Sequence, residues 1–266
     1  MIADIAPLEN LPKAFEILTN PPQKLFYRGK NAAISTLLEC EHKIAIVGTR
    51  KPNPYTKSFV ATLANKIAHN NGVVVSGGAL GVDIIAHTHA YPRTIMFSPA
   101  SLEILYPKSN ADMISKMMQE CLVLSEYEKE YMPHKYSFLE RNRLVIALSD
   151  KVIIPQADKQ SGSMQSARIA LELGKPLFVL PHRVGESEGT NALLASGEAQ
   201  AIYDVNAFIE SIFGAQSIIR DEDDEILRFC ANNPSFEEAY ERFGAKIYEY
   251  ELEGKIIRES SFIRVP

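Results

Sequence analysis

Residues 43–83 read KIAIVGTRKPNPYTKSFVATLANKIAHNNGVVVSGGALGVD, and this stretch decides the fold. Two short β-branched runs, at 43–47 and 73–76, flank an amphipathic helical segment that ends near Asn71-Gly72. A glycine commonly caps the end of a helix because it adopts a positive φ at little cost. A strand, a helix and a second strand in this order predict a βαβ unit with parallel strands.

The same alternation continues along the chain. The apolar runs RTIMFSP, CLVLSEY, DKVIIPQA and KPLFVLP are separated by helical stretches such as SMQSARIALELG. This pattern predicts an α/β fold, a Rossmann-like doubly wound and mostly parallel sheet with helices on both faces. We assign residues 42–214 to this domain and residues 1–41 to a helical lead-in that extends it, with PPQKLFYRGK as a Pro-rich turn and edge strand.

A second, smaller unit follows. The acidic run at 221–225 opens the amphipathic segment EILRFCANN, since acidic residues favour a helix N-terminus. FEEAYERFG and AKIYEYELEG indicate two more short helices, and KIIRESSFIRVP indicates a two-stranded hairpin. Residues 217–266 are therefore predicted to form a small C-terminal winged-helix-like domain.

Composition limits the class of protein. The 266 residues, 46% of them hydrophobic, can build one large core and a small appended domain. Cys40, Cys121 and Cys230 are widely spaced, which favours neither a disulfide framework nor a zinc site, and we expect no metal or cofactor. No signal peptide is evident, and no stretch approaches the roughly 20 apolar residues that span a bilayer. We expect a cytoplasmic protein with no membrane contact.

The net charge of −5 is unevenly distributed. The tail from Ser217 onward holds 7 basic and 12 acidic residues, which leaves 21 of each in residues 1–216. Residues 1–216 are thus nearly neutral, but a nearly neutral domain can still carry a local basic groove. The acidic tail is a poor phosphate binder, so we expect the C-terminal domain to contact protein rather than DNA.

Ligands of an open parallel sheet bind beyond the carboxyl ends of its strands, and two glycine-containing segments lie there. Arg50 and Lys51 follow the first strand. Arg50 can donate two parallel hydrogen bonds to a phosphate, or it can remain a solvated surface residue. In the segment 76–87, SGGALGVDIIAH, a glycine loop leads into a helix whose amides can hold an anion. The glycine spacing is not GxGxxG, which weighs against a dinucleotide. Asp83 is interpreted as a helix cap rather than a general base.

Two further segments carry polar residues. The segment 128–143, EKEYMPHKYSFLERNR, is predicted as a long loop in which cations alternate with aromatic rings. Cations bind phosphates, and a ring stacks on an unpaired base for roughly 1–3 kcal/mol, although Phe138 could instead pack on the core. Ser161, Gly162 and Ser163 precede a helix and suit either an anion or an ordinary N-cap. No GxSxG or HExxH motif occurs, so we expect no catalytic residue and no enzyme.

Five ordered segments, GTRKPNPY, SGGALGVDIIAH, SFLERNRLVIALSD, SGSMQSARIALELGKPLFVLP and GTNALLASGEA, resemble the signatures of the DprA/Smf family over roughly residues 11–213. The resemblance implies a homodimeric protein of bacterial natural transformation. Such a protein binds incoming single-stranded DNA more strongly than duplex DNA, protects it, and helps to load the RecA recombinase.

The resemblance also implies roles for individual residues. Arg50 and Lys135 would bind phosphates, Phe138 would stack on a base, and donors would come from Gly78, Ser161, Gly162 and Ser163. For a second set the choice between DNA contact and loop bracing stays open: Lys51, Arg141, Asn142, Arg143 and Asn191. The chain departs from the family at Leu80, where many relatives carry arginine, and in the long acidic loop LPHRVGESEGTN around Asn191.

Two alternatives come from other functional classes. A lysine-decarboxylase-like phosphoribohydrolase would carry PGGxGTxxE, but the equivalent strand end here, PQADKQSGSMQSA, lacks the glycine pair and the glutamate needed for acid–base chemistry. A nucleotide-binding regulator would use the anion sites but gives no reason for the aromatic and basic residues at 135–138.

Overall fold

The computed structural model describes residues 4–214, 225–230, 232–259 and 261–265. The chain divides into two compact units, residues 1–212 and residues 213–266, and each is described by itself. The predicted start of the C-terminal domain at Ser217 and most of the acidic run, residues 221–224, lie outside the described residues.

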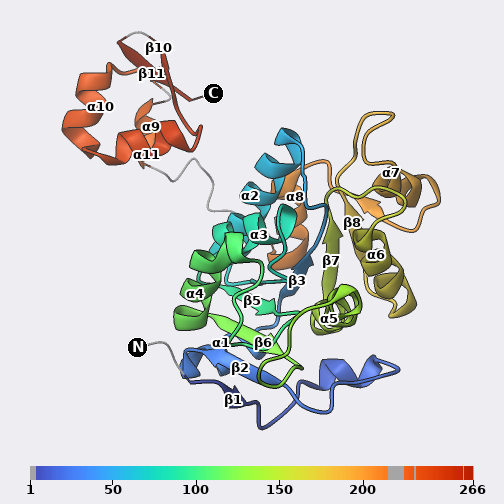
Figure 1. Cartoon of the computed structure of the whole chain (residues 1–266). Coiled ribbons are helices and arrows are strands. Elements are labelled where there is room, and N and C mark those ends of the chain that lie inside the picture. The colour runs from blue at the N-terminus through green and yellow to red at the C-terminus, as the bar shows by residue number, and fades with distance from the viewer. Residues whose placement is uncertain (1–3, 215–224, 231, 260, 266) are drawn as a thin grey trace. The chain divides into compact units, whose positions relative to one another are not determined.

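A mostly parallel sheet forms the centre of the larger unit, with strand order β1-β2-β6-β5-β4-β3-β7-β8-β9 (Figure 1). The strands are β1 (Ala6–Pro7), β2 (Phe26–Gly29), β3 (Lys43–Ile46), β4 (Val73–Ser76), β5 (Thr94–Phe97), β6 (Leu122–Ser125), β7 (Lys151–Ile154), β8 (Leu177–Val179) and β9 (Gln200–Ala201). Every residue of β4, β5 and β6 is buried, as expected for strands covered on both faces. The predicted doubly wound α/β sheet is confirmed.

The lead-in contributes two strands to the sheet, one more than the sequence predicted. β2 pairs antiparallel with β6, so the segment PPQKLFYRGK does supply a strand. It is not the edge, however, because β1 pairs antiparallel with its other side. β1 is only two residues long and has little pattern of its own, which is why it was not predicted.

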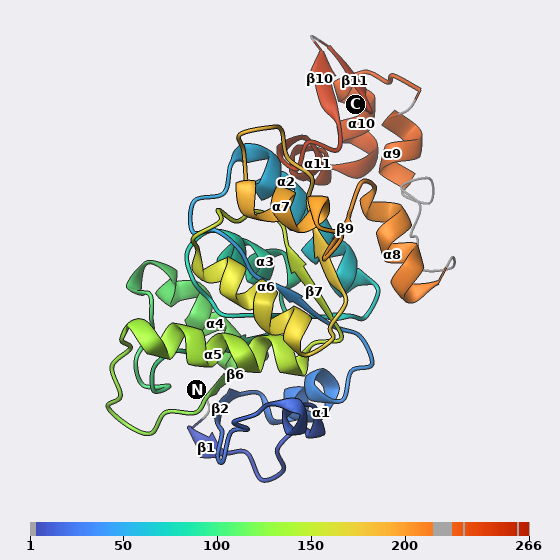
Figure 2. The same ribbon diagram turned by 90° about the vertical axis from the view of Figure 1, so that its right-hand side faces the viewer.

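Helices cover both faces of this sheet (Figures 1 and 2). In order they are η1 (Lys13–Ile17), α1 (Asn31–Leu38), α2 (Pro54–His69), α3 (Val82–Ala90), η2 (Lys108–Asn110), α4 (Ala111–Glu120), α5 (Lys135–Leu148), α6 (Gly162–Glu172), α7 (Glu188–Ala195) and α8 (Val205–Phe213). α2, α3 and α4 lie on one face, and α5 and α6 lie on the other. The chain changes face where α5 carries it from β6 back to β7, beside β3.

The change of direction creates a topological switch point between β3 and β7. The loops that follow these two strands leave toward opposite faces of the sheet, which opens a crevice at the carboxyl edge. Hydrogen bonds hold the two loops together: the Thr49 amide donates to the Gln156 carbonyl at 3.0 Å, and the Asn53 amide donates to Gln156 Oε1 at 3.0 Å. These bonds fix the two loops that border the crevice.

The smaller unit has its own core. It contains α9 (Glu225–Cys230), α10 (Phe236–Phe243), α11 (Lys246–Leu252) and the antiparallel pair β10 (Ile257–Glu259) and β11 (Phe262–Arg264). Its buried side chains are Ile226, Leu227, Cys230, Ala239, Ile247, Ile256 and Ile263. Three helices and a hairpin match the predicted elements, while the winged-helix classification stays a prediction. Over the described part of the chain, no helix has both the length and the apolar character to cross a membrane.

His87 is a fully buried histidine where α3 packs on β5. Its Nδ1 donates to Thr94 Oγ1 at 2.6 Å, and that hydroxyl in turn donates to the Val74 carbonyl at 2.9 Å. Nε2 has no hydrogen-bond partner among the described residues. Burial lowers the pKa of His87 to about 3, and the positive charge of Arg141 acts in the same direction.

We expect His87 to make the fold less stable in mild acid. The unfolded chain protonates this histidine near pH 6.5, whereas the folded chain keeps it neutral down to about pH 3. Between these values the unfolded state binds the extra proton, so the free energy of unfolding should fall by about 1.4 kcal/mol per pH unit as the pH drops below 6.5. Urea unfolding followed by circular dichroism from pH 7.5 to 5 should show this slope, and His87→Gln should reduce it. The exposed His69→Gln variant is the control, and equal slopes in both variants would contradict the assignment.

Candidate nucleic-acid interface

The crevice at the switch point is a hollow that we call the switch trough. It is lined by residues from four places: Gly48, Thr49 and Arg50 after β3; Ala79 and Asp83 around the start of α3; Phe138, Leu139, Arg141 and Asn142 of α5; and Ser161, Gly162, Ser163 and Ser166 around the start of α6. Among the residues predicted to bind DNA, the structure brings together Arg50, Phe138, Arg141, Asn142 and Ser161–Ser163. It does not place Lys51, Gly78, Lys135, Arg143 or Asn191 in the lining.

Helix α5 begins much earlier than the sequence suggested. The predicted loop at 128–143 is wrong in its second half, because α5 starts at Lys135. His134 is the N-cap residue, and its amide donates to Ser137 Oγ at 3.0 Å. Histidine is not among the usual N-cap residues, which hid this start. Lys135 and Phe138 are therefore one helical turn apart and on the same side of a rigid element rather than on a loop.

Arg141 is buried, with only 3% of its surface exposed, and it joins three elements. From α5 its Nη1 donates to the Phe97 carbonyl at the end of β5, at 2.8 Å, and to the Gly77 carbonyl after β4. Burial lowers the pKa of Arg141 to about 10, so the guanidinium stays charged at neutral pH. The sequence left open whether Arg141 contacts DNA or braces the loop. The hydrogen bonds in the structure are those of a bracing residue.

Asp83 lies beside Arg141 and is also buried. Its Oδ2 accepts from the Ala79 amide at 3.4 Å, in the glycine loop that precedes α3. The interpretation as a cap of α3 is therefore wrong: the N-cap position is Gly81, and the Asp83 carboxylate binds the loop before the helix. Burial raises the pKa of Asp83, while Arg141 and the amides of Ala79, Gly48 and Gly77 oppose that rise.

Three other polar residues left open by the sequence form bonds within the protein. Asn142 Nδ2 donates to Ser166 Oγ at 3.0 Å, which ties α5 to α6. Arg143 Nη2 pairs with Glu126 Oε1 at 2.6 Å, and both side chains are mostly buried. Asn191 Nδ2 donates to the carbonyls of His182, Arg183 and Glu186, at 3.2, 3.3 and 3.0 Å, and closes the acidic loop. These bonds favour bracing roles.

Two small residues matter through the backbone. Gly78 has a φ of 68°, and a Cβ at this position would overlap the Met96 side chain, so the loop needs glycine here. Its carbonyl accepts from Asn110 Nδ2 at 3.0 Å. Ser161 is the N-cap of α6, and its Oγ accepts from the Met164 amide at 3.3 Å. Ser161, Gly162 and Ser163 line the trough, and the first amides of a helix, where its cap does not use them, are available to an anion.

The exposed cations form a separate group. Arg50, Lys51 and Lys135 are exposed, and none of them forms an ion pair with a carboxylate in the described part of the chain. Arg50 lies over the ring of Phe138, with its guanidinium carbon 5.3 Å from the ring centroid. The Tyr106 ring lies at 5.6 Å from the Phe138 ring, tilted by 57°. Phe138 thus contacts both a cation and a second aromatic ring.

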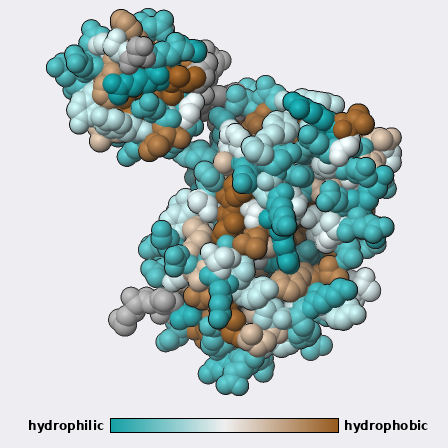
Figure 3. All heavy atoms as spheres, turned by 45° about the horizontal axis from the view of Figure 1, so that its top comes forward, coloured by the Kyte–Doolittle hydropathy of each residue, from teal (hydrophilic) through white to brown (hydrophobic). Residues whose placement is uncertain are grey.

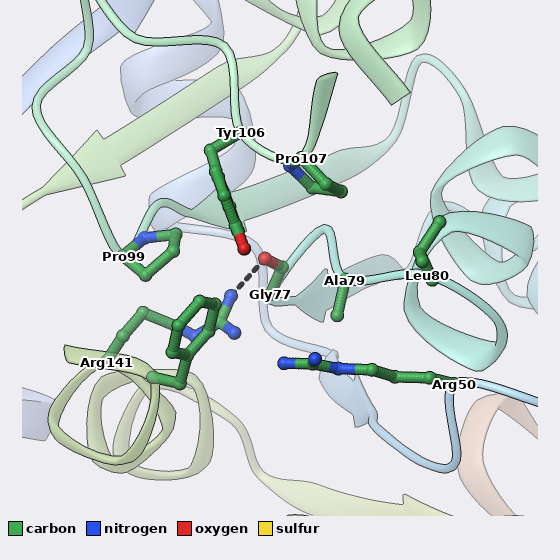
Figure 4. A pocket seen from close by; sticks show the side chains of 9 residues that line it. Arg50, Gly77, Ala79, Leu80, Pro99, Tyr106, Pro107 and Arg141 are labelled. Atoms are coloured by element: carbon green, nitrogen blue, oxygen red, sulfur yellow. Dashed lines mark hydrogen bonds between the residues drawn. The ribbon is translucent and has the colours of Figure 1, made fainter. Parts of the chain in front are cut away.

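A second hollow adjoins the trough. We call it the Tyr106 pocket; it shares Arg50, Ala79, Phe138 and Arg141 with the trough and adds Gly77, Leu80, Pro99, Tyr106 and Pro107 (Figure 4). Tyr106 lies in the connection between β5 and α4, and no feature of the sequence pointed to it. In the space-filling view, hydrophobic side chains gather along the middle of the larger unit between hydrophilic rims (Figure 3).

The arrangement suits anion binding better than acid–base chemistry. Asp83 is the one carboxylate among the described residues that line the trough, and it is occupied by the loop amides and Arg141. Glu126 pairs with Arg143, and Glu140 accepts from the Tyr127 hydroxyl at 2.8 Å. Within the described ranges, no group of three or more His, Cys, Asp or Glu side chains could hold a metal ion.

Known proteins are similar in sequence to this chain. Residues 7–213 match the family model for DNA recombination-mediator protein A. The DNA processing protein DprA of Bacillus subtilis (strain 168) is 35% identical over 198 residues, which cover 73% of this chain and 65% of that relative. The DNA processing protein DprA of Streptococcus pneumoniae is 33% identical over 181 residues, which cover 66% of this chain and 62% of that relative. The chain therefore spans less than two thirds of the length of these curated relatives.

Solved structures of DprA proteins are also similar to this chain. A structure of DNA processing protein A from Helicobacter pylori, described for the single-stranded DNA binding mode of that protein, is 56% identical with a TM-score of 0.76; the match covers 78% of this chain and 95% of that chain. An X-ray structure of DprA from Streptococcus pneumoniae is 31% identical with a TM-score of 0.68, and the match covers 74% of this chain and 69% of that one. Because the family model matches most of its length, this chain belongs to the DNA recombination-mediator protein A family, and the resemblance to DprA/Smf proteins is confirmed.

Proposed function

We propose that this chain binds single-stranded DNA across the switch trough, without chemistry of its own. The observation that carries the proposal is the Arg50–Phe138 pair, which presents a cation and an aromatic ring together at the edge of a trough. Single strands need this combination, because the phosphates bind cations and the unpaired bases stack on rings. The relation to the Helicobacter pylori protein supports the same ligand.

Within the trough, Arg50 binds a phosphate, and Ser161, Gly162 and Ser163 offer hydroxyl and amide donors at the start of α6. Lys135 lies outside the trough lining, one helical turn before Phe138 on α5, and binds a neighbouring phosphate of the strand. Phe138 stacks on one base. Arg141, Asn142, Arg143 and Asn191 act indirectly, by fixing α5, α6 and the loop at 182–186 through the bonds described above.

We also propose the wider role that membership of the family suggests. The chain acts in the cytoplasm as a homodimer during natural transformation, protects incoming single strands, and helps to load RecA, while the smaller unit contacts protein. Light scattering of the purified chain tests the dimer. A nuclease-protection assay on single strands, followed by a RecA strand-exchange assay, tests protection and loading separately.

The phosphate contacts predict a salt effect. Arg50→Ala and Lys135→Ala should each weaken binding of a dT oligomer by about 1.5 kcal/mol, roughly tenfold in Kd. Each should also reduce the slope of log K against log salt by about 0.7, because one phosphate contact is lost. Fluorescence anisotropy at several salt concentrations measures both quantities. Arg168→Ala on α6 and Lys57→Ala on α2, which remove exposed cations elsewhere, should change neither; an effect equal to that of Arg50→Ala would refute a localised site.

The stacking contact predicts a different signature. Phe138→Ala should weaken binding by roughly 1–3 kcal/mol with little change in the salt slope, since no phosphate contact is lost. Phe138→Leu keeps an apolar side chain of similar size but has no π face, and it should bind as weakly as Phe138→Ala. The same anisotropy titration measures this. If Phe138→Leu binds like the wild type, Phe138 only packs against α5 and its neighbours, and the stacking role is wrong.

A further inference from the structure

The smaller unit carries a cluster of three aromatic rings, Phe236, Tyr240 and Tyr248, which we call the aromatic patch. Phe236 and Tyr240 are one turn apart on α10, with ring centroids 5.9 Å apart and planes tilted by only 16°. The Tyr248 ring on α11 lies 5.5 Å from the Phe236 ring and 5.7 Å from the Tyr240 ring. Phe236 also packs on the core of the unit, but neither tyrosine does, and the two are 44% and 46% exposed. Packing within the unit therefore does not explain the two tyrosines.

The chain itself places a cation on this patch. The guanidinium carbon of Arg258, on β10, lies 3.8 Å from the centroid of the Phe236 ring. A guanidinium is attracted to the face of an aromatic ring because the ring carries negative charge density there. Within the described residues, no cation lies over the ring of Tyr240 or Tyr248. The patch thus holds one guanidinium and exposes two further rings of the same kind.

Unpaired carboxylates surround the two tyrosines. Glu237 is three residues before Tyr240 on α10, and Glu251 is three residues after Tyr248 on α11, so each is a neighbour of a tyrosine on its helix surface. In the part of the chain that the structure describes, four glutamates of these helices form no ion pair: Glu237, Glu241, Glu249 and Glu251. Three cations of the unit are already paired with other glutamates: Arg242, Lys255 and Arg264. The surface around the patch is therefore short of positive charge.

The chemistry of this surface selects among the classes of ligand. Nucleic-acid bases stack on aromatic rings, but the glutamates beside the patch repel phosphates, whose binding needs Lys and Arg. A purely apolar partner would cover the carboxylates without giving them hydrogen bonds, which is unfavourable. An arginine satisfies both parts of the surface, because its planar guanidinium stacks on rings and donates to carboxylates.

We infer that the aromatic patch binds an arginine-containing basic segment of a partner protein. A guanidinium of the partner lies on the tyrosine rings in the way that Arg258 lies on Phe236, and Glu237 and Glu251 pair with the positive charges of the segment. The inference rests on the proposed role of the smaller unit in contacting protein, and it adds the surface and the chemistry of the partner.

The test uses the full chain and three fluorescein-labelled peptides of twelve residues, in which glycine alternates with arginine, lysine or glutamine. Fluorescence anisotropy measures the Kd of each. The lysine peptide reports attraction to the negative charge of the unit, and the glutamine peptide should not bind. The arginine peptide should bind more tightly than the lysine peptide. Tyr240→Leu and Tyr248→Leu should each weaken the arginine peptide by about fivefold, the effect of one cation–π contact, and the lysine peptide by less than about twofold.

Two kinds of variant separate the ring from the charge. Tyr240→Phe keeps the ring face and should bind the arginine peptide like the wild type. Glu237→Gln combined with Glu251→Gln should weaken the arginine and lysine peptides alike, since it removes only charge. Tyr203→Leu, at a tyrosine of the larger unit that is 85% exposed, is the matched control and should change neither Kd. Thermal unfolding followed by circular dichroism checks that each variant is folded.

The outcomes are distinguishable. If the arginine peptide binds no more tightly than the lysine peptide, or if folded Tyr240→Leu and Tyr248→Leu variants bind it like Tyr203→Leu, the aromatic patch is not an arginine site and the inference is wrong, while the proposed protein contact can use another surface. If Tyr240→Leu instead weakens binding of a duplex of twenty base pairs, the smaller unit binds DNA and its proposed protein-contact role fails. Binding of a dT oligomer at the switch trough should be the same in all these variants.

Discussion

The candidate interface depends on the hydrogen bonds of the buried Arg141 guanidinium. The guanidinium connects α5 to the ends of β4 and β5, and so it fixes the helix that carries Lys135 and Phe138. A buried charge needs such partners, because removal of one of them leaves it uncompensated at a cost of several kcal/mol. The same contact explains Gly77, where any Cβ would overlap the guanidinium, and Asp83, whose negative charge lies close by.

The second constraint is the shared wall between two hollows of different character. Arg50 and Phe138 line both the switch trough and the Tyr106 pocket. On one side the wall faces serines, glycines and the start of α6; on the other it faces prolines, Leu80 and Tyr106. A nucleotide has the same division, with a charged backbone and a flat apolar base. The polarity of the two hollows therefore fits the proposed single-stranded ligand.

The sequence was informative where the pattern is local. The βαβ alternation located β3 through β8, and the rule that ligands bind at the carboxyl edge selected Arg50 and Ser161. Long-range contacts left no local pattern: the burial of Arg141 depends on carbonyls 44 and 64 residues away, and Tyr106 lies in a loop without a motif. The start of α5 was missed because His134 is an unusual N-cap, and β1 because two residues show no periodicity.

The contact between Arg50 and Phe138 also couples the two halves of the proposed ligand. A cation over an aromatic face contributes about 0.5–2 kcal/mol, depending on its exposure, and here it holds both side chains in place before any strand arrives. Arg50 and Phe138 line the same hollows, so a change to one side chain alters the surroundings of the other. In the proposed complex, phosphate binding and base stacking are therefore linked through this shared contact. Residues that share a partner in this way do not contribute additively, so the binding energy belongs to the pair rather than to either side chain alone.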